Sequence, residues 1–336
     1  MRQRDVTLFL LVASIPLLGM LNLAVGSVGI PWSAVWRILM GDEGTDEVWR
    51  NIVLGTRVPQ TLTAVACGAS LSVAGLEMQT VFRNPLAGPS VLGISSAASL
   101  GVAFVVLLSG ALGGGFLWRF GVLGNAALTL AAAVGALAVM GLMVFLSRRV
   151  EGNATLLVAG VLIGYIATAV TGVLKSFASE ENLHSFVVWG LGSFSRVTGG
   201  QVGVFVGLSG VFVAVSLLLG ERYAANLGLN VRRARMWCIG SAGVLTAVAT
   251  AYCGPVMFLG LAVPHICRGL LGTEDHRMLL PASLCCGASM ALLCNLLARL
   301  PGFEGTLPVN SVTALTGAPV ALWVLLRRKK GGGGNV

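Results

Sequence analysis

A long apolar run between Arg57 and Arg83 constrains the fold of this chain more than any other feature. A helix needs ~20 mostly apolar residues to cross the ~30 Å of hydrocarbon in a bilayer, and this run is long enough. The arginines at its two ends suit the two polar surfaces of a membrane. The run therefore predicts a membrane-spanning helix, closed by a rigid turn at Asn84-Pro85.

The composition extends this prediction to the whole chain. Apolar residues make up 56% and charged residues 10% of the 336 positions, a balance that would aggregate in water. We expect an all-α, polytopic membrane protein with about ten transmembrane helices in one domain over 1–330 and a flexible tail at 331–336. The predicted spans are 5–26, 58–82, 91–110, 122–147, 154–175, 201–219, 236–252, 254–271, 278–298 and 311–327.

The distribution of positive charge predicts the topology. With both termini in the cytoplasm, the inner segments carry 15 of the 22 lysines and arginines and the outer segments carry 7. Short loops rich in lysine and arginine stay on the cytoplasmic side. The net charge of +9 is thus a topology signal, and nucleic-acid binding is disfavoured.

Motifs for catalysis by the chain itself are absent from the sequence. It contains no G-x-x-x-x-G-K-[ST] loop for nucleotide phosphates, no H-E-x-x-H and no G-x-S-x-G. Six of its seven cysteines fall inside predicted spans and none forms a C-x-x-C pair, so we expect packing residues and no metal site. The chain is predicted not to be an enzyme and to bind no cofactor of its own.

Two polar interruptions and one long loop stand out among the apolar spans. Asn84-Pro85 and Gly254-Pro255 break the helical pattern, and non-helical backbone at membrane depth must be buried in protein or face a water-filled cavity. They are therefore candidates for shaping a pathway. The inner loop 220–235 is basic, and the sequence predicts two short helices in it, separated at Gly228. It is either an interfacial linker or a docking element for a soluble motor.

Small residues at a spacing of four occur in several spans. The pairs are Gly68 with Ser72, Gly160 with Gly164, and Gly203 with Gly207. This pattern lets two helix backbones approach closely in a membrane, although so many glycines also produce it by chance. Outside the spans, 31–39 reads as an amphipathic interfacial helix with two tryptophans, and 176–199 as a re-entrant or half-helical element near an outer mouth.

Several motifs, spread over nearly the whole chain, resemble those of one family, the FecCD permeases of type II ABC importers. Their order and spacing are the specific signal. They are Arg57-Val58-Pro59, Gly68-Ala69-Ser70-Leu71, Arg83-Asn84-Pro85-Leu86-Ala87-Gly88-Pro89, Gly220-Glu221, Gly254-Pro255-Val256-Met257-Phe258-Leu259-Gly260, Pro264-His265, Asp275-His276-Arg277, Ala298-Arg299 and Leu307-Pro308-Val309.

The resemblance implies a function and a set of partners. Members of this family take up iron-siderophore complexes, haem or vitamin B12, work as homodimers in the bacterial cytoplasmic membrane, and bind two cytoplasmic ATPase subunits that hold ATP. A periplasmic or lipid-anchored binding protein delivers the substrate. The resemblance places coupling to the ATPase on the loop 220–235, at Gly220, Glu221, Arg222, Ala225, Leu227, Gly228 and Leu229.

The resemblance also suggests roles for single residues. Arg57 and Arg299 are candidates to dock carboxylates of the binding protein, with interfacial snorkelling as the alternative. Gln60 stands where many members have a second arginine, and Asn295 where an aspartate is common. His265 and Arg268 are candidates to contact the ATPase at the inner face.

Two other classes of function stay open from the residues. A secondary transporter or channel that works without ATP is disfavoured because intramembrane ionisable residues are scarce. Glu77 is expected to lie near the inner interface and either to reach toward it or to cap the end of a neighbouring helix. A membrane anchor in a signalling or enzyme complex is the other alternative. The identity of the substrate does not follow from the sequence.

Overall fold

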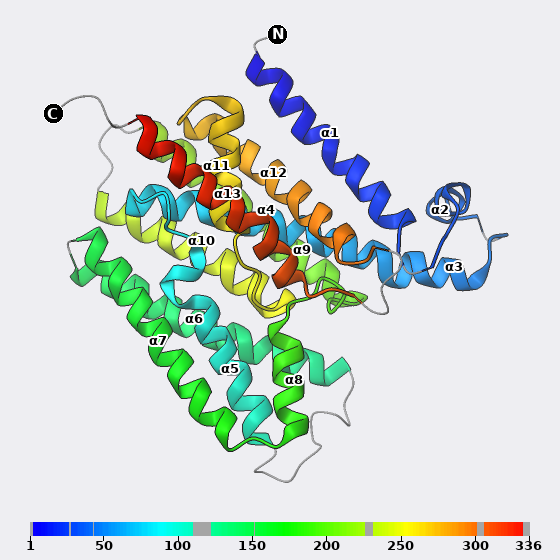
Figure 1. The fold of residues 1–336 in the computed structure, drawn as a ribbon, viewed down its shortest axis with the longest axis horizontal. Helices are drawn as coiled ribbons and strands as arrows, with labels where there is room; N and C mark the ends of the chain where they lie inside the picture. Colours follow the sequence, from blue (N-terminus) through cyan, green and yellow to red (C-terminus); the bar gives the residue numbers. More distant parts are fainter. Residues whose placement is uncertain are drawn as a thin grey trace.

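The computed structural model describes residues 3–26, 28–42, 44–109, 122–150, 152–225, 231–300 and 306–331, and within them it is entirely helical apart from turns and loops (Figure 1). The longer α-helices are α1 (Gln3–Ala24), α4 (Val58–Phe82), α5 (Ile94–Ser109), α6 (Val122–Arg149), α7 (Asn153–Ser176), α9 (Gly200–Ala225), α10 (Val231–Cys253), α11 (Leu259–Leu271), α12 (His276–Leu297) and α13 (Val309–Gly331). Shorter elements are α2 (Trp32–Leu39), α3 (Glu47–Ile52), α8 (Glu180–Gly190), the π-helix η1 (Val53–Arg57) and the 3₁₀ helix η2 (Pro89–Leu92).

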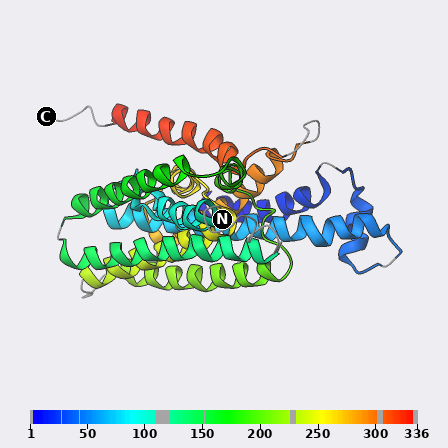
Figure 2. The same cartoon turned by 90° about the horizontal axis from the view of Figure 1, so that it is seen from below.

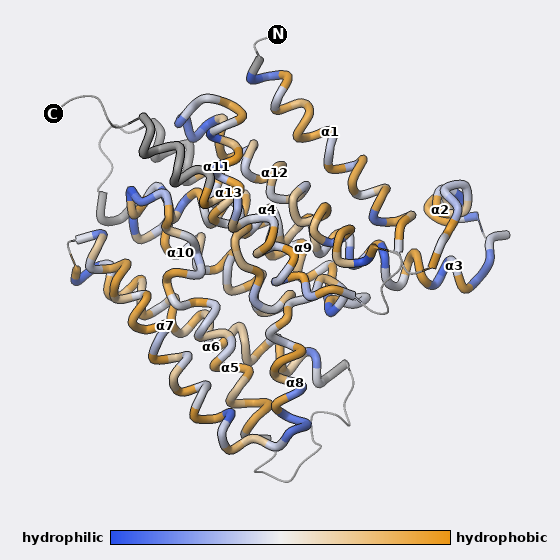
Figure 3. Tube along the Cα trace, in the orientation of Figure 1, coloured by the Kyte–Doolittle hydropathy of each residue, from blue (hydrophilic) through white to orange (hydrophobic). Residues whose placement is uncertain are grey.

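The helices have the lengths and composition that a membrane protein requires. Seven helical segments in the described part of the chain are long and apolar enough to cross a bilayer. Three shorter apolar helices, in α5, α11 and α13, complete the ten that the sequence predicts. Figure 3 shows apolar residues along much of the length of these helices, with polar ones gathered mainly near their ends and in the turns.

The helix α4 forms the centre of the bundle. Nearly all of its side chains are buried, and it packs against α9, α10, α11 and α12. Pro59 lies in its first turn, directly after the π-helix η1, which runs into α4 without a break. At the other end Arg83 caps the helix in the left-handed conformation, with φ of 47°. The backbone N–H of Leu86 then donates to Asn84 Oδ1 at 2.9 Å, which makes the rigid turn that the sequence predicts.

Glycines allow α4 to approach its neighbours at backbone distance. A Cβ atom placed on Gly75 would lie 1.7 Å from the carbonyl oxygen of Gly260 in α11. A Cβ on Gly68 would lie 2.2 Å from that of Gly287 in α12. Helix association in a membrane depends on such close packing. The small-residue spacing beginning at Gly68 is therefore confirmed as a packing motif.

The same spacing has different outcomes elsewhere. Gly160 in α7 packs against η2, where an added Cβ would lie 2.9 Å from the Cα atom of Leu92. Gly203 and Gly207 in α9 would meet no described atom within 4 Å, so the close packing predicted there is absent among the described residues of this chain.

Three helix boundaries differ from the prediction by five residues or more. Helix α9 continues to Ala225, so the separate short helix expected to open at Glu221 is instead the end of this helix. Helix α10 begins at Val231, earlier than 236. Helix α11 begins at Leu259 instead of 254, because Gly254 and Phe258 have positive φ angles of 75° and 67°, which a right-handed helix does not contain. The N–H of Met257 in this segment donates to Asn310 Oδ1 at 3.2 Å.

The segment before α4 forms a small unit on one side of the bundle. Helices α2 and α3 project sideways in both views of the fold (Figures 1 and 2). Val35 and Ile38 of α2 face a small separate core, whereas Trp32 and Trp36 are about half exposed. Helix α2 is thus amphipathic, as predicted for a helix at the membrane surface.

The first residues of α1 and the last residues of α13 lie at the same end of the bundle (Figure 1). Arg4 also reaches the carboxyl end of α11, where its Nε donates to the carbonyl oxygen of Leu271 at 3.1 Å. We name this end the terminal end. The opposite end, which holds the beginning of α4 and the end of α12, is named the cavity end for the feature described next.

Candidate functional site

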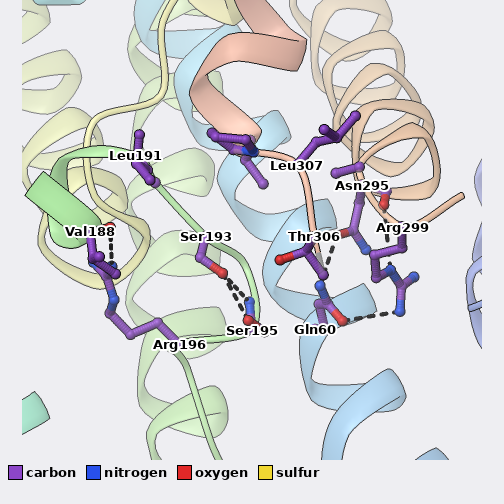
Figure 4. A pocket seen from close by; sticks show the side chains of 14 residues that line it. Gln60, Val188, Leu191, Ser193, Ser195, Arg196, Asn295, Arg299, Thr306 and Leu307 are labelled. Atoms are coloured by element: carbon purple, nitrogen blue, oxygen red, sulfur yellow. Dashed lines mark hydrogen bonds between the residues drawn. The ribbon is translucent and has the colours of Figure 1, made fainter. Parts of the chain in front are cut away.

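A cavity lies at the cavity end of the bundle (Figure 4). It has a volume of about 370 Å³, within the range of small-molecule sites, and it is lined by both polar and apolar groups. Its lining comes from α4, the segment that joins α8 to α9, the end of α12 and the beginning of α13. The lining residues are Gln60, Val188, Leu191, Gly192, Ser193, Ser195, Arg196, Asn295, Ala298, Arg299, Thr306, Leu307, Pro308 and Val309.

One wall of the cavity is a network of buried polar side chains. Gln60 Nε2 donates to Asn295 Oδ1 at 3.0 Å, and Asn295 Nδ2 donates to Asn22 Oδ1 at 2.9 Å. Arg299 Nη1 donates to Gln60 Oε1 at 3.0 Å, and its Nη2 donates to Asn22 Oδ1 at 2.8 Å. Each side chain bonds at least two others, so the network fixes the ends of α1, α4 and α12 relative to one another.

The Gln60 and Asn295 positions acquire a clear role in this wall. The sequence suggested only that they depart from a charged pattern, so that Asn295 would leave Arg299 without an intrahelical carboxylate. In the structure the two amides supply oxygen acceptors to one another and to the guanidinium. Among the described residues, the Arg299 guanidinium donates only to neutral oxygens, so no described carboxylate balances its charge beside the cavity.

The opposite wall is the chain between α8 and α9, in the region where the sequence predicts an element at the mouth. Arg196 lies over the ring of Trp189, with 6.0 Å between its guanidinium carbon and the ring centroid. Ser193 and Ser195 are joined by a hydrogen bond of 2.8 Å between their hydroxyls. Burial lowers the pKa of Arg196 from its ordinary value of 12.5, but an arginine stays charged in proteins. The cavity thus has a cation on each of two walls, seen in Figure 4.

The segment is held in place through backbone groups. The N–H of Ser193 donates to the carbonyl oxygen of Cys253 at 2.8 Å, and the N–H of Asn310 donates to that of Leu191 at 3.1 Å. Gly192 has φ of 70°, and a Cβ there would lie 2.9 Å from the carbonyl oxygen of Pro255. The Gly254-Pro255 turn therefore supports the cavity from behind.

The second proposed docking arginine, Arg57, has a different environment. Its side chain is 3% exposed and does not belong to the described cavity lining. Nη1 donates to the carbonyl oxygens of Leu23 and Ala24, both at 2.7 Å, and Nη2 donates to that of Val28. These carbonyls lie at and just after the end of α1, so Arg57 caps a helix terminus. In this conformation its guanidinium is not presented to a partner.

The residues that follow the two interruptions, Asn84-Pro85 and Gly254-Pro255, meet inside the bundle. Gly88, Pro89 and Ser90 line a second cavity of about 20 Å³ together with Val256 and Phe258, which follow Gly254-Pro255. Phe258 has a positive φ of 67°, uncommon for a residue with a side chain. This void is large enough for about one water. The sequence predicts each interruption separately, but only the structure brings them together.

The residues predicted for the inner face lie at the terminal end. His265 Nε2 donates to the carbonyl oxygen of Pro85 at 2.7 Å, and the His265 side chain is 8% exposed. Arg268 Nη1 donates to Gln79 Oε1 at 2.5 Å, and Gln79 Nε2 donates to the carbonyl oxygen of Leu261 at 3.1 Å. Both residues therefore bind α11 to the end of α4 and to the turn after it.

The residues of the predicted coupling loop are described only in part. Gly220, Glu221, Arg222 and Ala225 belong to the backbone of α9, and their side chains lie outside the described set. Leu227, Gly228 and Leu229 lie outside the described residues.

Titratable groups in the described part of the chain form no cluster that could hold a metal ion. All seven cysteines are buried and free of disulfides. Glu77 differs from expectation: instead of reaching toward the interface, its carboxylate is 6% exposed and accepts from the Ser241 hydroxyl at 2.9 Å. The sequence around Glu77 does not reveal that its partner is a serine in another helix.

Sequence reasoning missed two residues that build the cavity wall. Asn22 lies in an apolar span with no neighbouring motif, and Arg196 was counted only as an outer charge. Their signal is weak. Asn22 is a lone amide at the end of a span, and Arg196 is the only basic residue in a Gly- and Ser-rich segment.

The fold and the cavity define the chain as a multi-pass helical membrane protein with a polar site at one end of its bundle. The model of the FecCD transport family matches residues 12–327, and the chain belongs to this family.

Curated relatives include two named transport proteins. The vitamin B12 import system permease protein BtuC of Klebsiella pneumoniae is 37% identical over 281 residues, which cover 81% of this chain and 82% of the relative. The hemin transport system permease protein HmuU of Yersinia pestis is 34% identical over 319 residues, which cover 92% of this chain and 93% of the relative.

A solved structure has the same fold. It is described as an inward-facing conformation of a metal-chelate type ABC transporter, and its TM-score is 0.79 at 25% identity. The match covers 95% of this chain and 98% of the other.

Proposed function

We propose that this chain is the membrane-embedded permease subunit of an ABC importer for a metal chelate such as haem, an iron-siderophore complex or vitamin B12. The observation that carries the proposal is the family match over residues 12–327 together with a ten-helix bundle. The sequence holds no nucleotide-binding loop, so the energy for transport must come from ATPase subunits on another chain. Two copies of the permease would enclose the pathway, with two ATPases attached.

The proposed orientation places the terminal end in the cytoplasm and the cavity end outside the bacterial cytoplasmic membrane. The distribution of lysine and arginine supports it, because 15 of the 22 fall on the predicted inner side. The loop 220–235 then faces the ATPase, and the cavity faces the binding protein. In this proposal the chain contributes the helices that move and the transport pathway, and ATP is hydrolysed on the ATPase subunits.

The cavity supports a division of roles between the two docking arginines. Arg299 and Arg196 put positive charge on two walls of an accessible recess. A carboxylate of a binding protein would be attracted there, which favours a fast encounter and the correct orientation. Arg57 would support docking indirectly, by fixing the end of α1 beneath the Asn22 network. The Asn84-Pro85 and Gly254-Pro255 turns would shape the pathway.

The deciding experiment is reconstitution into liposomes. The permease is combined with the ATPase and the binding protein encoded beside it, and uptake of haemin and of vitamin B12 is measured with and without ATP. We expect ATP-dependent uptake of one of these chelates that needs the binding protein. An ATPase variant unable to hydrolyse ATP is the control. Accumulation by the permease alone would contradict the proposal and favour a secondary transporter.

The coupling role of the loop has its own test. Glu221→Ala and Gly228→Ala should leave binding-protein docking intact while separating ATP hydrolysis from uptake. The ratio of chelate transported to ATP hydrolysed is the measurement. Unchanged transport in both variants would remove this loop from the mechanism.

A further inference from the structure

The first turn of α10 is bonded to two other helices by one arginine. Arg235 Nη2 donates to the carbonyl oxygen of Ser147 at 2.6 Å, in the last turn of α6, and to that of Val150 at 2.7 Å, directly after this helix. Its Nη1 donates to Asn153 Oδ1 at 2.9 Å, in the first turn of α7. One guanidinium therefore holds the end of α6, the turn after it and the beginning of α7.

The chemistry of this contact requires arginine. The last carbonyls of an α-helix have no partner within the helix, and the negative end of the helix dipole lies there. A guanidinium carries five N–H donors in a fixed plane, so it can satisfy several acceptors at once. A lysine at this position would keep the charge but would offer a single nitrogen on a flexible chain. That one nitrogen could not span the acceptors of α6 and α7 together.

The contact continues through Asn153 to the central helix. While Asn153 Oδ1 accepts from Arg235, its Nδ2 donates to the carbonyl oxygen of Val81 at 2.7 Å. Val81 belongs to the last turn of α4, the central, almost fully buried helix of the bundle. The two side chains thus form a continuous hydrogen-bonded link from α10 through α7 to α4. The link joins segments that are 72 and 82 residues apart in the chain.

The position of this link gives it a mechanical meaning. Arg235 is the last residue of the predicted coupling loop 220–235 and already part of α10. The short turn between α6 and α7 could absorb a displacement of α10 if nothing fastened it. Hydrogen bonds from a charged donor are stronger than neutral ones, so this turn is clamped. A push on α10 is passed to neighbouring helices.

We propose that Arg235, with Asn153, is a positioning residue that makes the beginning of α10, the α6–α7 turn and the end of α4 move as one rigid body. The inference rests on the proposed function, in which the ATPase acts on the adjoining loop. It assigns the step between that loop and the pathway to two side chains. Rigid elements joined by such bonds are what carry a hinge motion from one site to another.

The test compares three variants in the complete transporter, reconstituted with its ATPase and binding protein. Arg235→Lys keeps the charge but loses the planar set of N–H donors. Asn153→Ala removes the hydrogen bond that continues the link to α4. Arg149→Gln is the matched control, because Arg149 is an exposed arginine at the end of α6 whose guanidinium carbon lies 5.5 Å from the ring centroid of Phe145 in the same helix. Two quantities are measured. The first is the amount of chelate transported per ATP hydrolysed, with haemin and vitamin B12 as probes, and the second is the thermal unfolding temperature.

We expect Arg235→Lys and Asn153→Ala each to lower the transport-to-ATP ratio several-fold while ATP hydrolysis continues. The double variant should be no worse than the more severe single one, because both act on one link. Arg149→Gln should leave the ratio unchanged. A purely structural role would lower the unfolding temperature and leave the ratio intact, and that result would overturn the inference.

The two levels of the proposal fail in different ways. Coupled uptake by the wild type with an unaltered ratio in both variants overturns the inference alone. If Arg235→Lys does not fold, the Asn153→Ala ratio decides. Absence of ATP-dependent uptake by the wild type overturns the proposed function and this inference together.

Discussion

The two ends of the bundle use arginine in contrasting ways. At the cavity end, Arg57 and Arg299 both bond to the end of α1, and the network that contains Arg299 borders an open recess. At the terminal end, Arg235 and Arg268 bond to carbonyl and amide oxygens of neighbouring helices. At the first end, Arg57 caps the end of α1, but Arg299 borders a space that a partner can enter. Charge at the second end is used to fasten one helix to the next.

The difference shows that arginines can serve two purposes, attracting a charged partner and holding helices together. A cation beside a cavity attracts an anion over a distance set by screening, so its effect depends on salt. A guanidinium that satisfies carbonyls at helix ends acts over a few ångströms and stiffens the fold. The ion pair of Arg37 with Asp42 lies on the exposed surface and belongs to neither set. The arginines compared at the two ends bond to neutral oxygens, and the ends differ in whether a cavity lies beside the charge.

The largest effect is expected at the cavity end, for Arg57→Ala. Removing this side chain leaves three backbone carbonyls without their charged donor, and each orphaned buried group costs about 1–3 kcal/mol. We expect a large loss of stability, measured by thermal unfolding of the protein in detergent. Arg37→Gln, at an exposed position, is the control. An Arg57→Ala protein as stable as this control would refute the capping role.

A smaller loss is expected at the terminal end, for His265→Ala. This change breaks one hydrogen bond, to the carbonyl oxygen of Pro85, with a cost of about 1–2 kcal/mol. The turn at Asn84-Pro85 should loosen, which hydrogen–deuterium exchange of residues 84–87 can detect. His184→Ala, on α8 at the other end of the bundle, serves as the comparison. Equal exchange in the two variants would show that the turn holds its shape without His265.

A change in binding without a change in stability is expected for Arg196→Gln. Its hydrogen bonds to the carbonyl oxygens of Val188 and Trp189 are long, between 3.3 and 3.5 Å, so little stability is lost. Removing a charge from the cavity should slow association of the binding protein a few-fold at low salt, with the difference shrinking as salt is added. Stopped-flow or surface-based kinetics would measure it.

Lys175→Gln separates this local effect from the loss of any positive charge. Lys175 lies at the end of α7, with its amine 4.7 Å from the centroid of the Phe186 ring, but it is not part of the described cavity lining. An equal slowing in the two variants would show that the cavity has no special role.

The smallest effect is expected in the exposed loop after α2. The backbone N–H of Gly44 and the Arg37 guanidinium lower the pKa of Asp42 below its ordinary value of 3.8. A carboxyl pKa that is lower in the folded state stabilises the protein at pH values above the ordinary pKa. This contribution is lost as the pH falls through the folded-state pKa. Asp42→Asn should therefore differ slightly from the wild type at neutral pH and converge with it in acid. Unfolding temperatures measured against pH would show a widening gap if this sign is wrong.

The sequence predicted the helices well because their signal is local. Apolar length and flanking arginines placed α4 at 58–82, the residues it occupies in the structure. The Asn84-Pro85 turn followed from the chemistry of two residues. The errors at α9 and α11 concern the ends of helices. A charged residue such as Glu221 does not end α9, and the positive φ angles of Gly254 and Phe258 keep the segment before Leu259 out of α11.

The candidate site was less predictable because its bonds join distant parts of the chain. Arg299 and Asn22, which meet in the cavity wall, are 277 residues apart, and Gln60 and Asn295 are 235 apart. Arg57 and Arg299 look alike as outer arginines in the sequence, yet one is buried under a helix end and the other borders the cavity. Nothing in either local pattern distinguishes them.

The sequence by itself determined that the protein lies in a membrane, the class of its fold and its family. Hydropathy, the distribution of charge and the order of motifs are all properties of the linear chain. The tertiary structure decided which polar groups receive a partner and which glycines carry a neighbouring backbone. Gly68 touches another helix and Gly203 meets no described atom, although both stand in the same small-residue pattern. The physical reason is that a hydrogen bond and a close contact need two partners, and only folding brings the second one within reach.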